Sequence, residues 1–430
     1  MPYKQDAIVR SGPLLLSVLP SFIKNEENTL KKIELITKDE LEARFRECLE
    51  QHRMPDYFLY LGEAGVKNWL NLNNSHGFPI PTRLKDLLMQ SIPSLIDYFP
   101  KDLNLVSIGV GKGDKERILL EAQLQRGSSR YFAVDISSRM IDEALKTVDN
   151  LKVDKTGLVA FLEDLPLVRQ YWSQPVLLCL LGNTFCNFDP DHILAIISGQ
   201  LESDDLLLLD CHLFPEQAEM EVSGQKQVDR VYRSEPSMRF SIDPLVQRGF
   251  DTDNCVFLME LRPIETDVGI VYKTNKQLQV LKNASVSCGR DKIKLNSGDI
   301  IQLGFTYKYT RPQVEGYLER NGFEALQQFQ SSDGENLLLL VRKRSGERDD
   351  LRKDMRDGLR KDVEKDMGGG LRKYITEDMS GGLREGEREE IREEEEIREE
   401  ISEEMKVDMD EGLEIDMDKG MEMDMDEDMN

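Results

Sequence analysis

Three closely spaced glycines form the part of the sequence that best matches a ligand-binding turn. The run Ser107-Ile-Gly-Val-Gly-Lys-Gly-Asp-Lys115 places them at Gly109, Gly111 and Gly113. A β-rich run precedes the turn, and residues with helical spacing follow it. Glycine lets the backbone turn tightly and lets a ligand approach the chain closely. Because the amino end of a helix offers free N–H donors and a positive dipole end, the run predicts a site for an anionic or carboxylate group.

Asp135 ends the next strand-like run, 26 residues after Gly109. In a strand–turn–helix–strand unit, an acid at this place can accept hydrogen bonds from both ribose hydroxyls of an adenosine cofactor. Two cofactor classes compete. The dinucleotide turn has the pattern GxGxxG, whose last position is Asp114 here. The pattern GxGxG instead favours S-adenosylmethionine (SAM), and the structural alternative is a turn that only lets a helix pack closely.

The elements that must position these residues alternate between strands and helices. Apolar runs predict strands at 103–108, 130–134, 176–181 and 206–210, and helical spacing fits 118–125, 140–148 and 192–200. This alternation predicts an α/β fold with a doubly wound, Rossmann-like parallel sheet. Further helices are expected at 38–52, 82–97, 227–248 and 312–321, and further strands at 256–261, 269–272, 300–309 and 337–341.

These patterns divide the chain into five parts. We expect an extension at 1–34, a helical part of the substrate lobe at 35–100, a SAM-binding core at 101–215, a smaller α+β substrate domain with the closing strands at 216–345, and an acidic tail at 346–430.

The acidity of the chain belongs mostly to that tail. The whole chain has 56 Lys+Arg and 81 Asp+Glu, a formal net charge of -25. Residues 346–430 hold 15 of the basic and 33 of the acidic side chains, or −18, which leaves −7 for the rest. Bulk charge therefore excludes nucleic-acid binding, which needs a basic face. No apolar run reaches the roughly 18 residues of a membrane span, and residues 13–19 lack the features of a secretory signal.

The tail also contains a repeat. Asp-Met begins at 354, 366 and 378, and Gly-Leu-Arg begins at 358, 370 and 382, which gives a period of 12 residues. Twelve residues advance about 120° around a helix, so the repeat builds no constant apolar stripe. We expect a disordered, Met-rich acidic tail, with an acidic interaction segment as the alternative.

Cysteine and histidine usage argues against a metal site. Six cysteines are scattered without a CxxC pair, and none of the four histidines has metal-ligand spacing. Cys179 lies in an apolar run and is expected to be buried. Free thiols fit a cytoplasmic location.

Several motifs together resemble one family. The runs 107–115, Tyr131-Phe-Ala-Val-Asp-Ile-Ser137 and Leu181-Gly-Asn-Thr-Phe-Cys-Asn-Phe188 resemble the histidine-specific, SAM-dependent methyltransferases. Pro81-Thr-Arg83 and Gly304-Phe-Thr-Tyr-Lys-Tyr309 add further matches. The resemblance covers roughly 35–345 and is stronger to the fungal branch, which includes dimethylallyltryptophan N-methyltransferases of ergot-alkaloid pathways.

The resemblance implies roles for individual residues. On the cofactor side, Lys115 would pair with the methionine carboxylate of SAM, Asp135 and the adjoining Ile136 would lie at the ribose, and Ala160-Phe161 would face the adenine. On the acceptor side, the implied residues are Asn187, which would hold the substrate, and the site tyrosines Tyr60 and Tyr232. The sequence shows no dedicated general base, and either tyrosine acting through a water is the candidate.

Two departures from the family bear on the methyl acceptor. The histidine enzymes bind the imidazole with Glu-x-Ser, and Gly304 and Thr306 stand at those positions here. Pro79 replaces a family tyrosine. A site without the anionic acceptor is expected to hold an imidazole N–H less firmly and to leave an emptied corner for a bulkier, less polar acceptor.

Together with the cofactor turn, this resemblance implies a SAM-dependent N-methyltransferase acting on a small amino-acid-like or alkaloid-precursor amine of secondary metabolism, with a tryptophan-derived acceptor favoured over histidine. The alternatives are methyl transfer to another acceptor, such as a phenol oxygen, and a catalytically silent scaffold of the same fold. The oligomeric state is left open.

Overall fold

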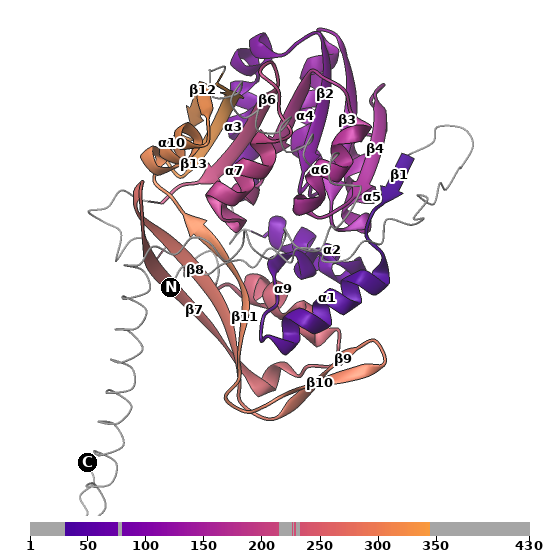
Figure 1. Ribbon diagram of the computed structural model, residues 1–430, viewed down its shortest axis with the longest axis vertical. Coiled ribbons are helices and arrows are strands. Elements are labelled where there is room, and N and C mark those ends of the chain that lie inside the picture. Colours follow the sequence, from indigo (N-terminus) through magenta and orange to yellow (C-terminus); the bar gives the residue numbers. More distant parts are fainter. Residues whose placement is uncertain (1–30, 76–79, 215–225, 227, 229–232, 345–430) are drawn as a thin grey trace, which may run out of the picture. The chain divides into compact units, whose positions relative to one another are not determined.

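A computed structural model describes residues 31–75, 80–214, 226, 228 and 233–344 of the chain (Figure 1). An eight-stranded sheet forms its centre, with the strand order β1-β4-β3-β2-β5-β6-β13-β12. In this order the strands are β1 (Lys31–Glu34), β4 (Asp154–Val159), β3 (Ser128–Asp135), β2 (Asp102–Ile108), β5 (Val176–Leu180), β6 (Leu206–His212), β13 (Asn336–Lys343) and β12 (Phe323–Gln330). The tail expected at 346–430 lies outside the described residues.

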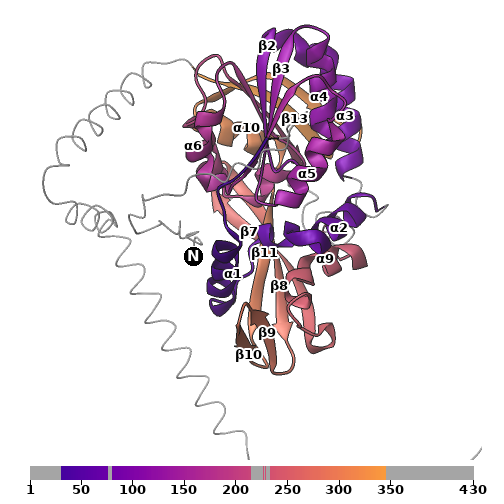
Figure 2. The same ribbon diagram turned by 90° about the vertical axis from the view of Figure 1, so that its right-hand side faces the viewer.

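The sheet is doubly wound, as the sequence predicted. Strands β1 to β6 pair in parallel, whereas β13 is antiparallel to β6 and to β12. One face is covered by α3 (Ile80–Leu95), α4 (Asp114–Leu124) and α5 (Ser138–Thr147), and the other by α6 (Leu165–Val168), α7 (Pro190–Ser198) and α10 (Arg311–Arg320) (Figures 1 and 2). Both faces of the central strands are therefore buried, which explains why their sequences are nearly continuous apolar runs.

A smaller α+β lobe adjoins the sheet. Its three-stranded antiparallel sheet has the order β11-β8-β7, with β7 at Cys255–Thr266, β8 at Gly269–Val280 and β11 at Ile300–Lys308. A hairpin of β9 (Ala284–Cys288) and β10 (Asp291–Leu295) extends the lobe. Buried apolar side chains join this lobe to four helices. These are α1 (Lys38–Glu50), the 3₁₀ helix η1 (Asp56–Tyr60), α2 (Gly62–Asn73) and α9 (Glu235–Val246).

Three strands of the main sheet, β1, β4 and β12, were not expected from the sequence. β12 is one edge strand and pairs only with β13 in this sheet. β1 has only four residues, two of them lysines, and β4 begins with the polar residues Asp154-Lys-Thr. Both lie at the other end of the sheet, where β1 is the edge strand and is partly exposed. An edge position removes the need for an apolar run, so the periodicity signal is lost there.

Candidate active site

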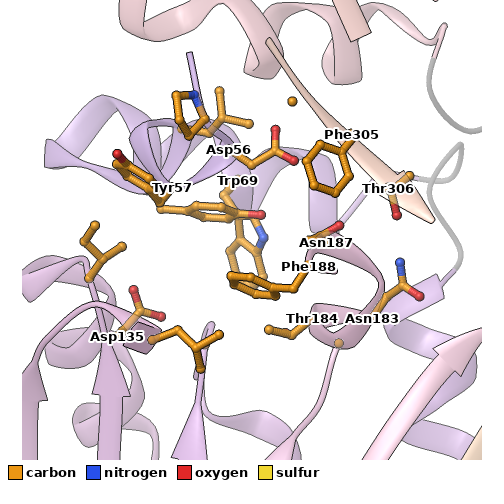
Figure 3. Close-up of a pocket in the computed structure, with 18 of the residues that line it drawn as sticks. Asp56, Tyr57, Trp69, Asp135, Asn183, Thr184, Asn187, Phe188, Phe305 and Thr306 are labelled. Carbon is orange, nitrogen blue, oxygen red and sulfur yellow. The ribbon is translucent and has the colours of Figure 1, made fainter. Parts of the chain in front are cut away.

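A cavity of about 670 Å³ opens where the carboxyl ends of the central strands meet the smaller lobe (Figure 3). The chain winds from β2 to β3 on one side and returns to β5 on the other side of β2. In open α/β sheets, ligands bind in the crevice at such a switch point. The volume is within the range of cavities that hold small ligands. Residues from both lobes line it, so the fold brings the expected cofactor and acceptor residues to one space.

The glycine turn borders this cavity directly. Gly109 and Gly111 line it and have φ angles of 68° and 54°. A Cβ atom on Gly111 would lie 2.9 Å from the ring of Trp69, which α2 places over the turn. Gly111 is thus required both by its backbone conformation and by this close approach. Gly113 is not among the cavity-lining residues; its Cβ position meets the backbone of Ala144, so it allows α4 to pack against α5.

Asp135 projects into the cavity from the end of β3. The residue is buried, with 9% of its surface exposed. Its Oδ1 accepts a hydrogen bond from the N–H of Ser137 at 2.9 Å. Burial raises the pKa of this carboxyl to about 6, against the lowering effect of backbone N–H groups. Ile136 lines the cavity next to it. A buried carboxylate with spare acceptor capacity fits the ribose hydroxyls of SAM.

A second buried carboxylate supports the opposite wall, and sequence analysis missed it. Asp210, two residues before the end of β6, accepts the N–H groups of Gly182 (2.5 Å) and Asn183 (3.1 Å to Oδ2), and burial raises its pKa to about 6. Asn183 has a φ of 63° and accepts the His212 N–H through its side chain. Lys115 lines the cavity and its Nζ lies 3.5 Å from the Cβ position of Gly182. The only sequence signal was the acid that ends the Leu206–Asp210 strand.

The part of the cavity assigned to adenine is aromatic. Ala160 and Phe161 both line it, directly after β4. The Arg44 guanidinium carbon lies 3.9 Å from the centre of the Phe161 ring, and Tyr57 meets that ring edge-on at 5.4 Å. Arg44 and Tyr57 were not expected from the sequence, because α1 and η1 precede the sheet by many residues.

Aromatic rings also surround the part of the cavity that was expected to hold the methyl acceptor. Asn187, on the 3₁₀ helix η5 (Thr184–Asn187), lies between the two halves, beside Phe188 and near Trp69 (Figure 3). Tyr60 lines the cavity and packs edge-on against Phe240, with ring centres 5.4 Å apart. The structure therefore brings Tyr60 and Asn187 to the same space. Tyr232 and Pro79 lie outside the described residues.

The corner of the cavity at Gly304 and Thr306 still contains an acidic side chain, contrary to the expectation from these two residues. Both line the cavity, but the Asp56 carboxylate from η1 lies over Gly304 and pairs with Lys276 at 2.8 Å. Thr306 is buried, and its hydroxyl has no hydrogen-bond partner among the described residues. The corner thus keeps a carboxylate and a hydroxyl, although a different element supplies the carboxylate.

Arg83, a further match to the family, acts away from the cavity. It pairs with Asp333 at 3.0 Å and with Glu335, and so ties α3 to the loop before β13. Within the described ranges, no three His, Cys, Asp or Glu side chains gather as metal ligands. No helix in that part of the chain combines the length and apolarity of a membrane span. Cys179 is buried, as expected.

One family model and several solved structures match this chain. The family model described as "Histidine-specific methyltransferase, SAM-dependent" matches residues 41–343. A comparison with curated proteins gives no match. Similar solved structures include a SAM-dependent methyltransferase from Clostridium acetobutylicum ATCC 824, with 13% identity, 61% of this chain and 92% of that chain covered, and a TM-score of 0.32. Another is SAM-bound CalS10, an amino pentose methyltransferase from Micromonospora echinaspora, with 12% identity and a TM-score of 0.32. That match covers 64% of this chain and 96% of CalS10. Because the family model spans most of the chain, the protein belongs to the histidine-specific, SAM-dependent methyltransferases.

Proposed function

We propose that this chain methylates the amine nitrogen of a small aromatic amino acid or alkaloid precursor in secondary metabolism, with a tryptophan-derived acceptor favoured over histidine. The observation that carries the proposal is the single cavity that joins the glycine turn and Asp135 to an aromatic acceptor half, with Asn187 between them. The rings of Tyr57, Trp69, Phe188 and Phe305 offer wide apolar contact, which suits an indole better than a small imidazole.

The cofactor half fits SAM by the chemistry of its donors and acceptors. Asp135 would accept the ribose hydroxyls, and Lys115 with the amino end of α4 would hold the methionine carboxylate. Phe161 would pack on the adenine. When bound, SAM supplies a methyl group on a cationic sulfonium, which makes that methyl open to attack by a nitrogen lone pair.

The chain's own residues must then present a neutral amine in line with that methyl. The α-amino group of a model peptide has a pKa near 8, so an amine of this kind is mostly protonated at neutral pH and must lose a proton before its nitrogen can attack. Asn187 would accept an N–H of the amine and aim its lone pair, and Tyr60 would pass the proton to water. Holding the two atoms about 3–3.5 Å apart in a dry cavity supplies most of the rate enhancement.

Two measurements on the full chain test the proposal. Calorimetry with SAM separates an enzyme from a silent scaffold, because a scaffold needs no SAM binding. A screen of tryptophan-like, tyrosine-like and histidine amines with methyl-labelled SAM then identifies the acceptor. Label on a phenol oxygen would replace the N-methyl proposal with O-methylation, and label on none of these acceptors in a protein that binds SAM would reject the proposed acceptor class.

A further inference from the structure

Position 304 leaves room at the acceptor end of the cavity. Gly304 lies opposite Lys276 in the β11–β8 pairing, next to an irregularity between Gln302 and Gly304. Its φ is 141°, a conformation that residues with side chains rarely adopt. A Cβ atom there would lie within 2.8 Å of Asp56 Oδ2 and closer still to the rest of that carboxyl group. The missing side chain and the Asp56 carboxylate therefore occupy the same place.

Among the residues that the structure describes, two donors hold this carboxylate, and they leave part of its acceptor capacity unused. Asp56 accepts Lys276 Nζ at 2.8 Å and the backbone N–H of Phe305. The side chains of Asp56 and Lys276 are 18% and 10% exposed, so the pair is largely dry but open to the cavity that both line. A carboxylate has about four lone-pair sites, and these two donors fill only two of them. Removing such a pair from water is costly, and an apolar pair of similar size is often as stable.

Aromatic rings stand on either side of the carboxylate. Figure 3 shows Asp56 between Tyr57 and Phe305, with Asp135 across the cavity and Trp69, Asn187 and Phe188 between the two acids. An acceptor whose amine lies at Asn187 would therefore extend its ring toward Asp56. Flat aromatic walls beside a largely buried carboxylate are complementary to a heteroaromatic ring that carries an N–H donor.

We infer that Asp56, positioned by Lys276, binds the ring N–H of the methyl acceptor and determines specificity for indole or imidazole rings over rings without a donor. The inference rests on the proposed function, because it takes the acceptor amine to be at Asn187. It assigns to a residue of η1 the ring binding that, by the family resemblance, residues at positions 304 and 306 of β11 would perform.

The test measures binding without turnover, in full-length protein saturated with S-adenosylhomocysteine. Titration calorimetry compares tryptophan with 3-(3-benzothienyl)alanine, and histidine with 4-thiazolylalanine. In each pair a sulfur replaces the ring N–H while the ring keeps its shape. The wild type should bind at least one parent amino acid about ten- to hundredfold more tightly than its sulfur analogue, the range of one charge-assisted hydrogen bond. In Asp56→Asn this ratio should fall to about threefold or less.

A matched control comes from a second Lys–Asp pair. Asp142 pairs with Lys32 at 2.7 Å but on the surface, with 42% of its side chain exposed. Asp142→Asn should keep the wild-type ratio. A folded Asp56→Asn variant with the wild-type ratio would overturn the inference. So would a wild type that binds each analogue as well as its parent, or binds neither parent, and this result needs no variant. Selective binding without methyl transfer to either parent would instead reject the proposed function and leave the role of Asp56 intact.

Discussion

Replacing Asp135 by asparagine should stabilise the ligand-free protein and weaken its binding of SAM. Burial raises the pKa of Asp135 from 3.8 to about 6. A shift of about 2 pKa units corresponds to about 3 kcal/mol by which the ionised form disfavours folding. Asparagine removes this charge. Its NH₂ group cannot accept a backbone N–H as the second carboxylate oxygen does, and the loss of that hydrogen bond lowers the free energy of unfolding by about 1 kcal/mol. The free energy of unfolding should therefore rise by about 1–2 kcal/mol at pH 8.

The sign of the effect depends on pH. Because the folded-state pKa lies above the unfolded one, the native wild type gains stability as the pH falls through about 6, and this gain is complete below about 3.8. The advantage of the variant should therefore shrink between pH 8 and pH 4. Urea unfolding of wild type, Asp135→Asn and the exposed control Asp204→Asn measures this directly.

Calorimetry on the same three proteins measures the functional cost. Asp135→Asn should bind SAM about ten- to hundredfold more weakly, because it loses charge-assisted hydrogen bonds to the ribose. The control should bind as the wild type does. An unchanged SAM affinity would remove Asp135 from the cofactor site. A variant that is less stable than wild type at pH 8, or whose gain is the same at both pH values, would refute the burial argument.

Three further perturbations have definite expected outcomes. Gly111→Ala should lower the free energy of unfolding by about 1–3 kcal/mol, since φ is 54° there and a tryptophan ring fills the Cβ position; calorimetry should also show weaker SAM binding. Deleting 346–430 should leave the melting temperature and methyl transfer nearly unchanged, because that segment offers little apolar surface for docking; a fall of many degrees would contradict this. Gly304→Glu with Thr306→Ser, which restores the family's residues, should lower the melting temperature and give no gain on histidine, because the new side chain overlaps Asp56; increased histidine methylation would show that the carboxylate can move aside.

The meeting of the glycine turn and Asp135 at one cavity was predictable from the sequence, because the signals for both are local. The turn from β2 into α4 and the acid that ends β3 each follow from neighbouring residues, and parallel pairing of β2 with β3 then places them together. Gly113 shows the limit of this argument, since the same run of glycines serves both the cavity and the packing of α4 on α5. The position of a glycine in the motif does not show whether it borders the cavity or lets two helices pack closely.

The part of the cavity around Asp56 and Gly304 depends on contacts that no local sequence pattern predicts. Asp56 and Lys276 are 220 positions apart, and only the packing of η1 on β8 and β11 brings them together. In the sequence, Asp56 is an ordinary acid at the start of a short helix. Its burial and its lysine partner are properties of the tertiary structure, so neither could be predicted from residue spacing.

Gly304 and Asp56 are therefore best understood as one feature. Considered alone, a glycine in place of an acid indicates a lost charge and a wider, less polar corner. In the structure the glycine instead makes space for a carboxylate from another element, so the corner keeps an acidic side chain that comes from η1 and not from β11. Hydrogen bonding depends on where the oxygen lies and how it is aimed, whichever strand or helix carries it. The glycine at position 304 therefore changes where the carboxylate lies in this corner of the cavity and does not remove it.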